Sequence, residues 1–240
     1  MRLLIASLAL CLCGCVTVST GGGGPAAPRA PVPASAAAVP DRISSGNAAA
    51  NFRSAVSRVE PAAEAICRDR APRLNCDFLI QVHPNPRLAP NAFQTLDRRG
   101  RPVVVFTRSL IAEARNVHEI AFVVGHETAH HIENHIAKQR QSATTGAIIG
   151  TVIGQISGAD AGVVRDLGRA GAVAGARRFS KEHELEADAL GTIITARAGF
   201  NPVRGAAFFS RIPDPGDRFL GTHPPNADRI ATVRRVARGL

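Results

Sequence analysis

The chain has 240 residues and a formal net charge of +10, because 29 lysines and arginines outnumber 19 aspartates and glutamates. Proteins that bind nucleic acid combine such charge with aromatic residues or a recognition helix, and the Arg-rich patches at residues 98–101 and 234–235 lack both. We therefore predict no nucleic-acid partner. An anionic membrane surface, or simple solubility, accounts better for the charge.

The first 14 residues have the character of a secretory signal peptide. Arg2 is followed by an apolar stretch that is too short to span a bilayer stably. The stretch ends in Leu12-Cys13-Gly14-Cys15, which resembles the bacterial lipobox. We therefore expect residues 1–14 to be a lipoprotein signal peptide, with cleavage before Cys15 and acylation of its thiol.

Residues 15–45 are expected to be the lipidated cysteine and a flexible tether. They include four consecutive glycines and a stretch rich in Pro, Ala and Ser, with too little apolar content to fold. By resemblance to lipoprotein sorting, Val16 in place of an aspartate favours the outer membrane. The predicted location is the periplasmic face of that membrane, with Cys15 as the anchor.

Residues 46–240 suffice for one domain with a substantial core. Residues 48–70 read as a helix, and residues 78–82 and 101–107 read as strands. Cys67 and Cys76 flank a short charged loop, and an oxidising compartment would favour a disulfide between them. The alternative is a pair of buried thiols, because a cysteine in a helix is often only a small apolar residue.

The most informative motif lies in a helix predicted over residues 116–141. It reads His126-Glu127-Thr128-Ala129-His130, an H-E-x-x-H pattern preceded by an apolar run. Residues four apart share a helix face, so His126 and His130 can present two imidazoles to one metal ion. Glu127 lies beside them and can act as a general base without being a ligand. Because a pattern with two wildcards also occurs by chance, support is needed from elsewhere in the chain.

The same predicted helix carries a second pair of histidines, His131 and His135. They are also four residues apart, but on a continuous helix they lie about 100° from the H-E-x-x-H face. We expect a solvated or supporting role for both rather than metal ligation.

Residues 143–176 form a glycine-repeat insertion in this domain. Glycine recurs every fourth position from 146 to 162, with isoleucine and valine between. Glycine weakens a helix, so this spacing needs a compensating close contact, such as small residues provide between paired helices. We predict a helical hairpin packed over the site or against a membrane or partner subunit. The alternatives are a flexible loop and a transmembrane helix, the latter disfavoured by Gln155 and Asp160.

A second candidate site helix is predicted over residues 177–198. Glu184 and Asp188 are four residues apart on it, so both carboxylates can face the first helix. Zinc takes four ligands and a catalytic site keeps one position open, so two histidines and one carboxylate complete the protein's share. Asp188 suits a hydrogen bond to a ligating imidazole. Glu182 and Glu186 are assigned to the solvated face.

Together these motifs resemble peptidase family forty-eight of the metallo class. Its members include the CAAX prenyl protease, the bacterial membrane heat-shock protease and periplasmic lipoprotein proteases. The resemblance covers residues 50–235 and rests on four segments in the right order. They are the H-E-x-x-H segment, the F-S-x-x-x-E-x-x-A-D-x-x-G pattern of residues 179–191, the Asn-Ala-Phe turn and strand within residues 90–107, and Thr-His-Pro at residues 222–224 with Arg229.

The resemblance implies an α+β, mainly helical, zincin-like metallopeptidase domain with a small edge β-sheet and a two-helix zinc site. It selects Glu184 as the third ligand beside His126 and His130, with one Zn²⁺ per chain. The strand at residues 103–107 is expected to be the edge strand that aligns the substrate backbone.

The C-terminal segment supplies candidates for stabilising the oxyanion. Zinc peptidases commonly use tyrosine, histidine or arginine for this purpose, and the chain contains no tyrosine. We therefore expect His223 or Arg229 to take the role. In periplasmic relatives a histidine equivalent to His223 can instead keep the enzyme latent, so both roles stay open.

These features predict a zinc-dependent metalloendopeptidase that hydrolyses envelope proteins in quality control at the outer membrane. Its partners would be protein or peptide substrates, the membrane and, through the glycine-repeat segment, further subunits. Two other function classes stay open: a weakly proteolytic, chaperone-like assembly factor and a mainly structural envelope lipoprotein. The intact set of His126, Glu127, His130 and Glu184 favours catalysis over both.

Overall fold

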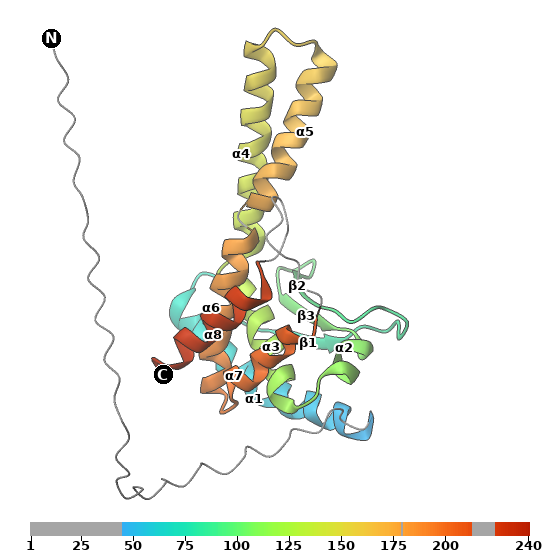
Figure 1. Cartoon of the computed structure of the whole chain (residues 1–240), viewed down its shortest axis with the longest axis vertical. Helices are drawn as coiled ribbons and strands as arrows, with labels where there is room; N and C mark the ends of the chain where they lie inside the picture. The colour runs from blue at the N-terminus through green and yellow to red at the C-terminus, as the bar shows by residue number, and fades with distance from the viewer. Residues whose placement is uncertain (1–44, 179, 213–223) are drawn as a thin grey trace, which may run out of the picture. The chain divides into compact units, whose positions relative to one another are not determined.

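The computed structural model describes residues 45–178, 180–212 and 224–240. The predictions for the signal peptide, Cys15, the tether and His223 lie outside the described residues. The described chain is mainly helical with one small sheet, which confirms the predicted fold class (Figure 1). In chain order the elements are α1 (Ser45–Arg70), β1 (Leu79–Val82), β2 (Ala92–Leu96), β3 (Pro102–Phe106), α2 (Arg108–Glu113), α3 (Val117–Ile132), α4 (His135–Ile156), α5 (Ala161–Arg178), α6 (Ser180–Arg197), α7 (Pro202–Ala206), the 3₁₀ helix η1 (Ala207–Ser210) and α8 (Asn226–Ala237).

Helix α3 packs against both α1 and α6. Asn116 begins it, since the Asn116 side chain accepts a hydrogen bond from the Glu119 N–H and so satisfies one of the free amides of the first turn. Phe122 of α3, Val59 of α1 and Ile194 of α6 are completely buried where these helices meet. The apolar first half of α3 therefore fixes its position, and its second half carries the H-E-x-x-H motif.

The sheet has the strand order β1-β3-β2, with β1 parallel and β2 antiparallel to β3. All five residues of β3 are buried, as expected for a central strand made of a continuous apolar run. The prediction that residues 103–107 form an edge strand is therefore wrong. The edge strand beside the site is β2, whose first residues the family resemblance assigned to the Asn-Ala-Phe turn.

The predicted helix over residues 116–141 is broken at Asn134. Asn134 has φ +56° and ψ +38°, a left-handed conformation that asparagine adopts more readily than most residues. Helix α3 ends at Ile132 and α4 begins at His135 in a new direction. The prediction of one continuous helix is wrong, and so is the position it gave to His135.

Helices α4 and α5 form a hairpin that contains the whole glycine-repeat segment (Figure 1). A Cβ atom at Gly146 would collide with the carbonyl oxygen of Gly171, and one at Gly171 with that of Gly146. Glycine therefore allows the two backbones to touch. The turn between the helices contains Gly158, whose φ of +72° suits glycine.

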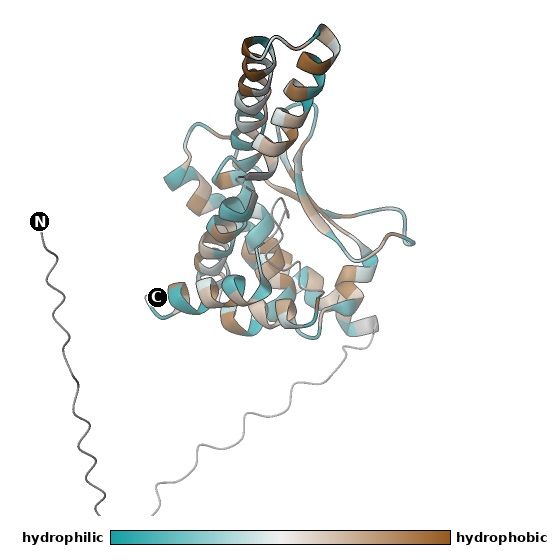
Figure 2. Cartoon of the chain, turned by 45° about the horizontal axis from the view of Figure 1, so that its top comes forward, coloured by the Kyte–Doolittle hydropathy of each residue, from teal (hydrophilic) through white to brown (hydrophobic). Residues whose placement is uncertain are grey.

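The outer faces of this hairpin are apolar near the turn, where Figure 2 shows hydrophobic positions on both helices. Ile153 and Ile156 of α4 are 56% and 82% exposed, and Val163 of α5 is 45% exposed. None of the helices in the described part of the chain combines the length and apolar character that crossing a bilayer requires.

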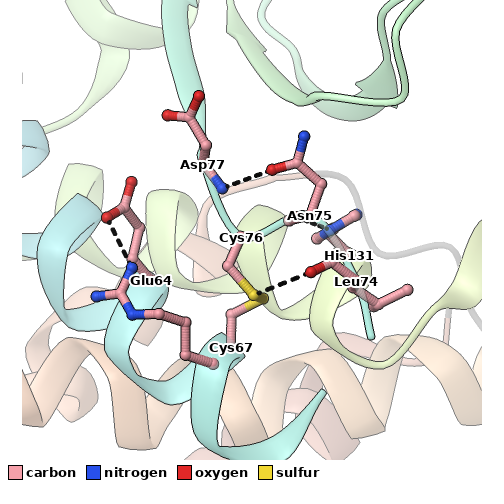
Figure 3. Close-up of a disulfide and its surroundings, with 8 residues drawn as sticks. Glu64, Cys67, Leu74, Asn75, Cys76, Asp77 and His131 are labelled. Atoms are coloured by element: carbon pink, nitrogen blue, oxygen red, sulfur yellow. Dashed lines mark hydrogen bonds and ion pairs between the residues drawn. A yellow bond between two sulfur atoms is a disulfide. The ribbon is translucent and has the colours of Figure 1, made fainter. Parts of the chain in front are cut away.

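Cys67, in the last turn of α1, forms a disulfide with Cys76 (Figure 3). The loop that the disulfide closes is also attached to α3, because the His131 Nε2–H donates to the carbonyl oxygen of Asn75 at 2.7 Å. Burial lowers the pKa of His131, although this hydrogen bond opposes the shift. His131 is therefore a buried supporting residue and not a solvated one.

Candidate metal centre

Three predicted ligands converge between α3 and α6. The Nε2 atoms of His126 and His130 are 3.0 Å apart, and the Glu184 carboxylate lies 3.5 Å from the first and 3.4 Å from the second. One donor atom from each residue lies within 4.8 Å of the others. Two imidazoles and one carboxylate are a donor set that suits zinc, so the residues present fit a zinc ion.

Two glycines allow the ligand-bearing helices to approach each other. A Cβ atom at Gly191 of α6 would lie 2.9 Å from the backbone nitrogen of His126, and one at Gly125 of α3 would lie 2.9 Å from the carbonyl oxygen of Gly191. Any larger side chain would push the helices apart. The glycines flanking the two motifs thus hold Glu184 within reach of the histidines.

Asp188 and Arg229 support His126 from behind. The Nδ1–H of His126 donates to Asp188 Oδ1 at 2.9 Å, and Asp188 is fully buried. Arg229 of α8 donates to both oxygens of the same carboxylate, from Nε at 2.7 Å and from Nη2 at 2.8 Å. The guanidinium carbon lies 3.8 Å from the centroid of the Phe209 ring, which fixes its plane.

Hydrogen bonds within this group stabilise the charged forms of Asp188 and His126. Burial would raise the pKa of Asp188, but hydrogen bonds from Arg229 and His126 outweigh burial and lower it, so Asp188 is ionised at neutral pH. Burial opposes charge on His126, yet hydrogen bonds with Asp188 and Glu184 raise its pKa to about 9. An environment that stabilises positive charge at a buried imidazole also suits a bound cation.

Glu127 faces a cleft of about 760 Å³ that the metal-ligand cluster borders. Glu127 is 9% exposed, so it is largely buried but remains accessible to water. Strand β2 contributes Phe93 and Gln94 to the lining of the cleft, and η1 contributes Phe208 and Phe209. The cleft therefore combines a general-base candidate, a metal-binding cluster and an exposed strand edge.

Sequence analysis missed the environment of His135 and Glu186. The break at Asn134 places His135 beside His130. His135 is 5% exposed, and its Nδ1 lies 2.8 Å from His130 Nδ1. Its Nε2 lies 3.0 Å from a carboxylate oxygen of Glu186. Burial lowers the pKa of His135 despite this hydrogen bond, so the ring is neutral at pH 7. Glu186 thus has a defined partner and is not merely part of a solvated face.

Comparison with known proteins agrees with this geometry. The family model of peptidase family M48 matches residues 58–237, three quarters of the sequence, and the match contains the three converging candidate ligands. No curated protein matches the sequence. The chain belongs to peptidase family M48, a family of zinc metallopeptidases.

Proposed function

We propose that this zinc metallopeptidase is an endopeptidase of the cell envelope, anchored through lipidated Cys15 at the periplasmic face of the outer membrane. The observation that carries the catalytic part is the cluster of His126, His130 and Glu184 beside Glu127 in one cleft. The lipobox-like segment before Cys15 and the disulfide support an oxidising envelope compartment. Envelope proteins that undergo quality control are the proposed substrates.

His126, His130 and Glu184 would hold the zinc ion. When bound, zinc polarises a scissile carbonyl and makes water more acidic. Glu127 then takes the proton of the attacking water and transfers it to the nitrogen of the departing amine. Its neighbours on α3 hold its backbone in place while its side chain faces the cleft.

Strand β2 provides the surface along which an extended substrate would bind. It pairs with β3 on one side, and no strand of the described chain pairs with its other side. A substrate segment can therefore add to the sheet as a further strand, with main-chain hydrogen bonds setting its register. Phe93, which is 39% exposed and lines the cleft, would contact an apolar substrate side chain.

The role of Arg229 follows from its hydrogen bonds. Its Nε and Nη2 groups both donate to Asp188, so we assign it to ordering the Asp188–His126 pair. His223 is then the proposed group near the reacting carbonyl, either as an oxyanion donor or as a latency ligand. His223→Ala would lower kcat about 10²-fold in the first case and raise basal proteolysis in the second. Unchanged kinetics would eliminate both roles.

The decisive experiment compares zinc content with casein cleavage in matched variants. Glu127→Gln should keep about one zinc per chain and lose activity by about 10²–10⁴-fold, because it removes the base and no ligand. Glu184→Gln should lose both zinc and activity, whereas Glu182→Gln, an exposed carboxylate on the same helix, should retain both. Equal zinc loss in the two α6 variants would disprove the ligand assignment, and an active Glu127→Gln would disprove the mechanism.

The anchoring is tested separately. Acyl chains supply most of the membrane affinity of a lipoprotein, so Cys15→Ser should move the protein from the detergent phase to the aqueous phase. If the variant still follows the detergent, Cys15 is not the main anchor and the apolar faces of the α4–α5 hairpin become the next segment to alter.

A further inference from the structure

The ring of His130 has a partner on each side. Its Nε2 belongs to the metal-ligand cluster, and its Nδ1 lies 2.8 Å from Nδ1 of His135. Beyond His135, the Nε2 atom lies 3.0 Å from Glu186 Oε2, which also accepts a hydrogen bond from Lys138 at 3.1 Å. These contacts form a chain from the cluster to the protein surface.

One arrangement of protons satisfies the whole chain. A ligating Nε2 of His130 carries no hydrogen, so the ring proton lies on Nδ1 and is donated to His135. His135 accepts it at Nδ1, which places its own proton on Nε2, facing Glu186. The ionised Glu186 accepts that proton and is stabilised by the Lys138 ammonium group.

We propose that His135 and Glu186 are positioning residues that hold the His130 ring in its ligating tautomer and orientation and thereby set zinc affinity. The proposal rests on the ligand set of the proposed function. It assigns a role in the site to two side chains outside the ligand cluster, of which His135 also borders the cleft. Ligating imidazoles commonly depend on such a hydrogen-bond partner, whose loss costs 10–100-fold in metal affinity.

The backbone is shaped to place His135 there. The left-handed conformation of Asn134 ends α3 and makes His135 the first residue of α4. The His135 ring then lies against that of His130. The ring also stacks on His183 of α6, with centroids 4.4 Å apart and planes 16° apart. A buried imidazole held on two sides has little freedom to leave the Nδ1 contact with His130.

The two histidine ligands are therefore supported by parallel arrangements with different exposure. His126 is backed by Asp188 and Arg229, whose side chains are 0% and 7% exposed. His130 is backed by His135 and then by Glu186 and Lys138, whose side chains are 48% and 42% exposed. Because solvent screens the outer pair, we expect Glu186 to contribute less than His135.

The test measures zinc affinity of the full-length protein in detergent by competition with a chelator of known affinity. His135→Leu removes the acceptor while keeping an apolar volume, and it should weaken zinc binding 10–100-fold. His135→Gln retains a side-chain oxygen that can accept from His130 and should restore most of the affinity. Glu186→Gln should weaken binding about threefold to tenfold while one zinc per chain still binds at saturation, and Glu182→Gln should have no effect.

Two further readouts separate positioning from a general structural role. The ligand-field spectrum of the Co²⁺-substituted protein should change in His135→Leu and remain unchanged in Glu182→Gln, since only the former alters a ligand's orientation. In the His135→Leu background, Glu186→Gln should cause no additional loss, because the chain is already interrupted.

A His135→Leu protein that melts at a lower temperature but binds zinc within twofold of the wild type would overturn the proposal. Additive losses from His135→Leu and Glu186→Gln would overturn it as well. If zinc binding instead proves insensitive to His126→Ala, the ligand set of the proposed function is wrong. The control therefore distinguishes failure of the positioning inference from failure of the function on which it rests.

Discussion

Two helix pairs in this protein use glycine to bring backbones into contact, with different results. At the α3–α6 contact, Gly125 and Gly191 lie opposite each other and the surrounding side chains are buried. At the α4–α5 contact, Gly146 and Gly171 do the same, but Ile153 and its outward-facing neighbours remain exposed.

The difference lies in what covers each contact. The α3–α6 pair lies in the core, so its close approach determines the distance between the candidate metal ligands and contributes to global stability. The α4–α5 pair packs mainly on itself in the described chain, so we expect it to separate locally without exposing the core. Perturbations of the first pair should therefore affect zinc and the whole fold, and perturbations of the second should stay local.

The largest expected difference is between two isoleucines. Ile194 of α6 is completely buried and Ile153 of α4 is 56% exposed. Ile194→Ala should lower the free energy of unfolding by about 2–5 kcal/mol, because it leaves a cavity, whereas Ile153→Ala should change it by less than about 0.5 kcal/mol. Urea unfolding followed by circular dichroism measures both. Similar losses would mean that the hairpin face is covered in solution.

Removal of the disulfide should come next in size. Cys67 and Cys76 are nine positions apart in sequence, so the bond restricts a short loop in the unfolded chain. The double variant Cys67→Ser/Cys76→Ser should lose about 2–3 kcal/mol of global stability. Hydrogen exchange within α4 and α5 should remain as fast as in the wild type. A change confined to the hairpin would contradict the division into core and local pairs.

The glycine contacts themselves give a matched comparison. Gly191→Ala places a methyl group against the His126 backbone and should cost about 1–3 kcal/mol of stability and weaken zinc binding. Gly171→Ala should accelerate hydrogen exchange in α4 and α5 and leave zinc affinity unchanged. Gly239→Ala is the control, since its methyl group would meet only the Val236 carbonyl oxygen at 3.5 Å. Zinc loss in Gly171→Ala would show that the two contacts are coupled.

The smallest expected effect is on the pH dependence of stability and arises from His118 of α3. Burial, with the nearby charge of Arg204, lowers the pKa of His118 below 6.5, and its Nδ1 accepts a hydrogen bond from the Asn201 N–H. The unfolded state therefore binds this proton more readily, so the stabilisation is present above pH 6.5 and is lost as pH falls towards the folded-state pKa. Unfolding measured from pH 7.5 to 5 should show a shallower decline in His118→Gln than in the wild type.

The ligand-bearing helices could be predicted because their information is local. The four-residue spacings of His126 with His130 and of Glu184 with Asp188 place each pair on one helix face, and Asn116 marks where α3 begins. The family pattern then distinguished Glu184 from its acidic neighbours.

The parts that were missed depend on a single dihedral angle or on tertiary pairing. The φ of Asn134 redirects all of α4, and an asparagine in a polar stretch does not reveal that conformation from sequence. The order of the strands depends on tertiary packing. The apolar β3 is the central strand, and β2, whose residues favour strands less, is an edge strand. His135 and Glu186 were misassigned for the first of these reasons.

The hairpin is also the segment of the chain that connects α3, with two of the candidate metal ligands, to α6, with the third. Its turn at Gly158 lies between the H-E-x-x-H histidines and Glu184 in the chain, so a cut there would place two candidate ligands in one fragment and the third in the other. Neither fragment would contain the complete donor set, and the fragments would reassociate through the two glycine contacts. Zinc binding by co-expressed halves would then report complementation, which makes this protein a natural candidate for a split protease.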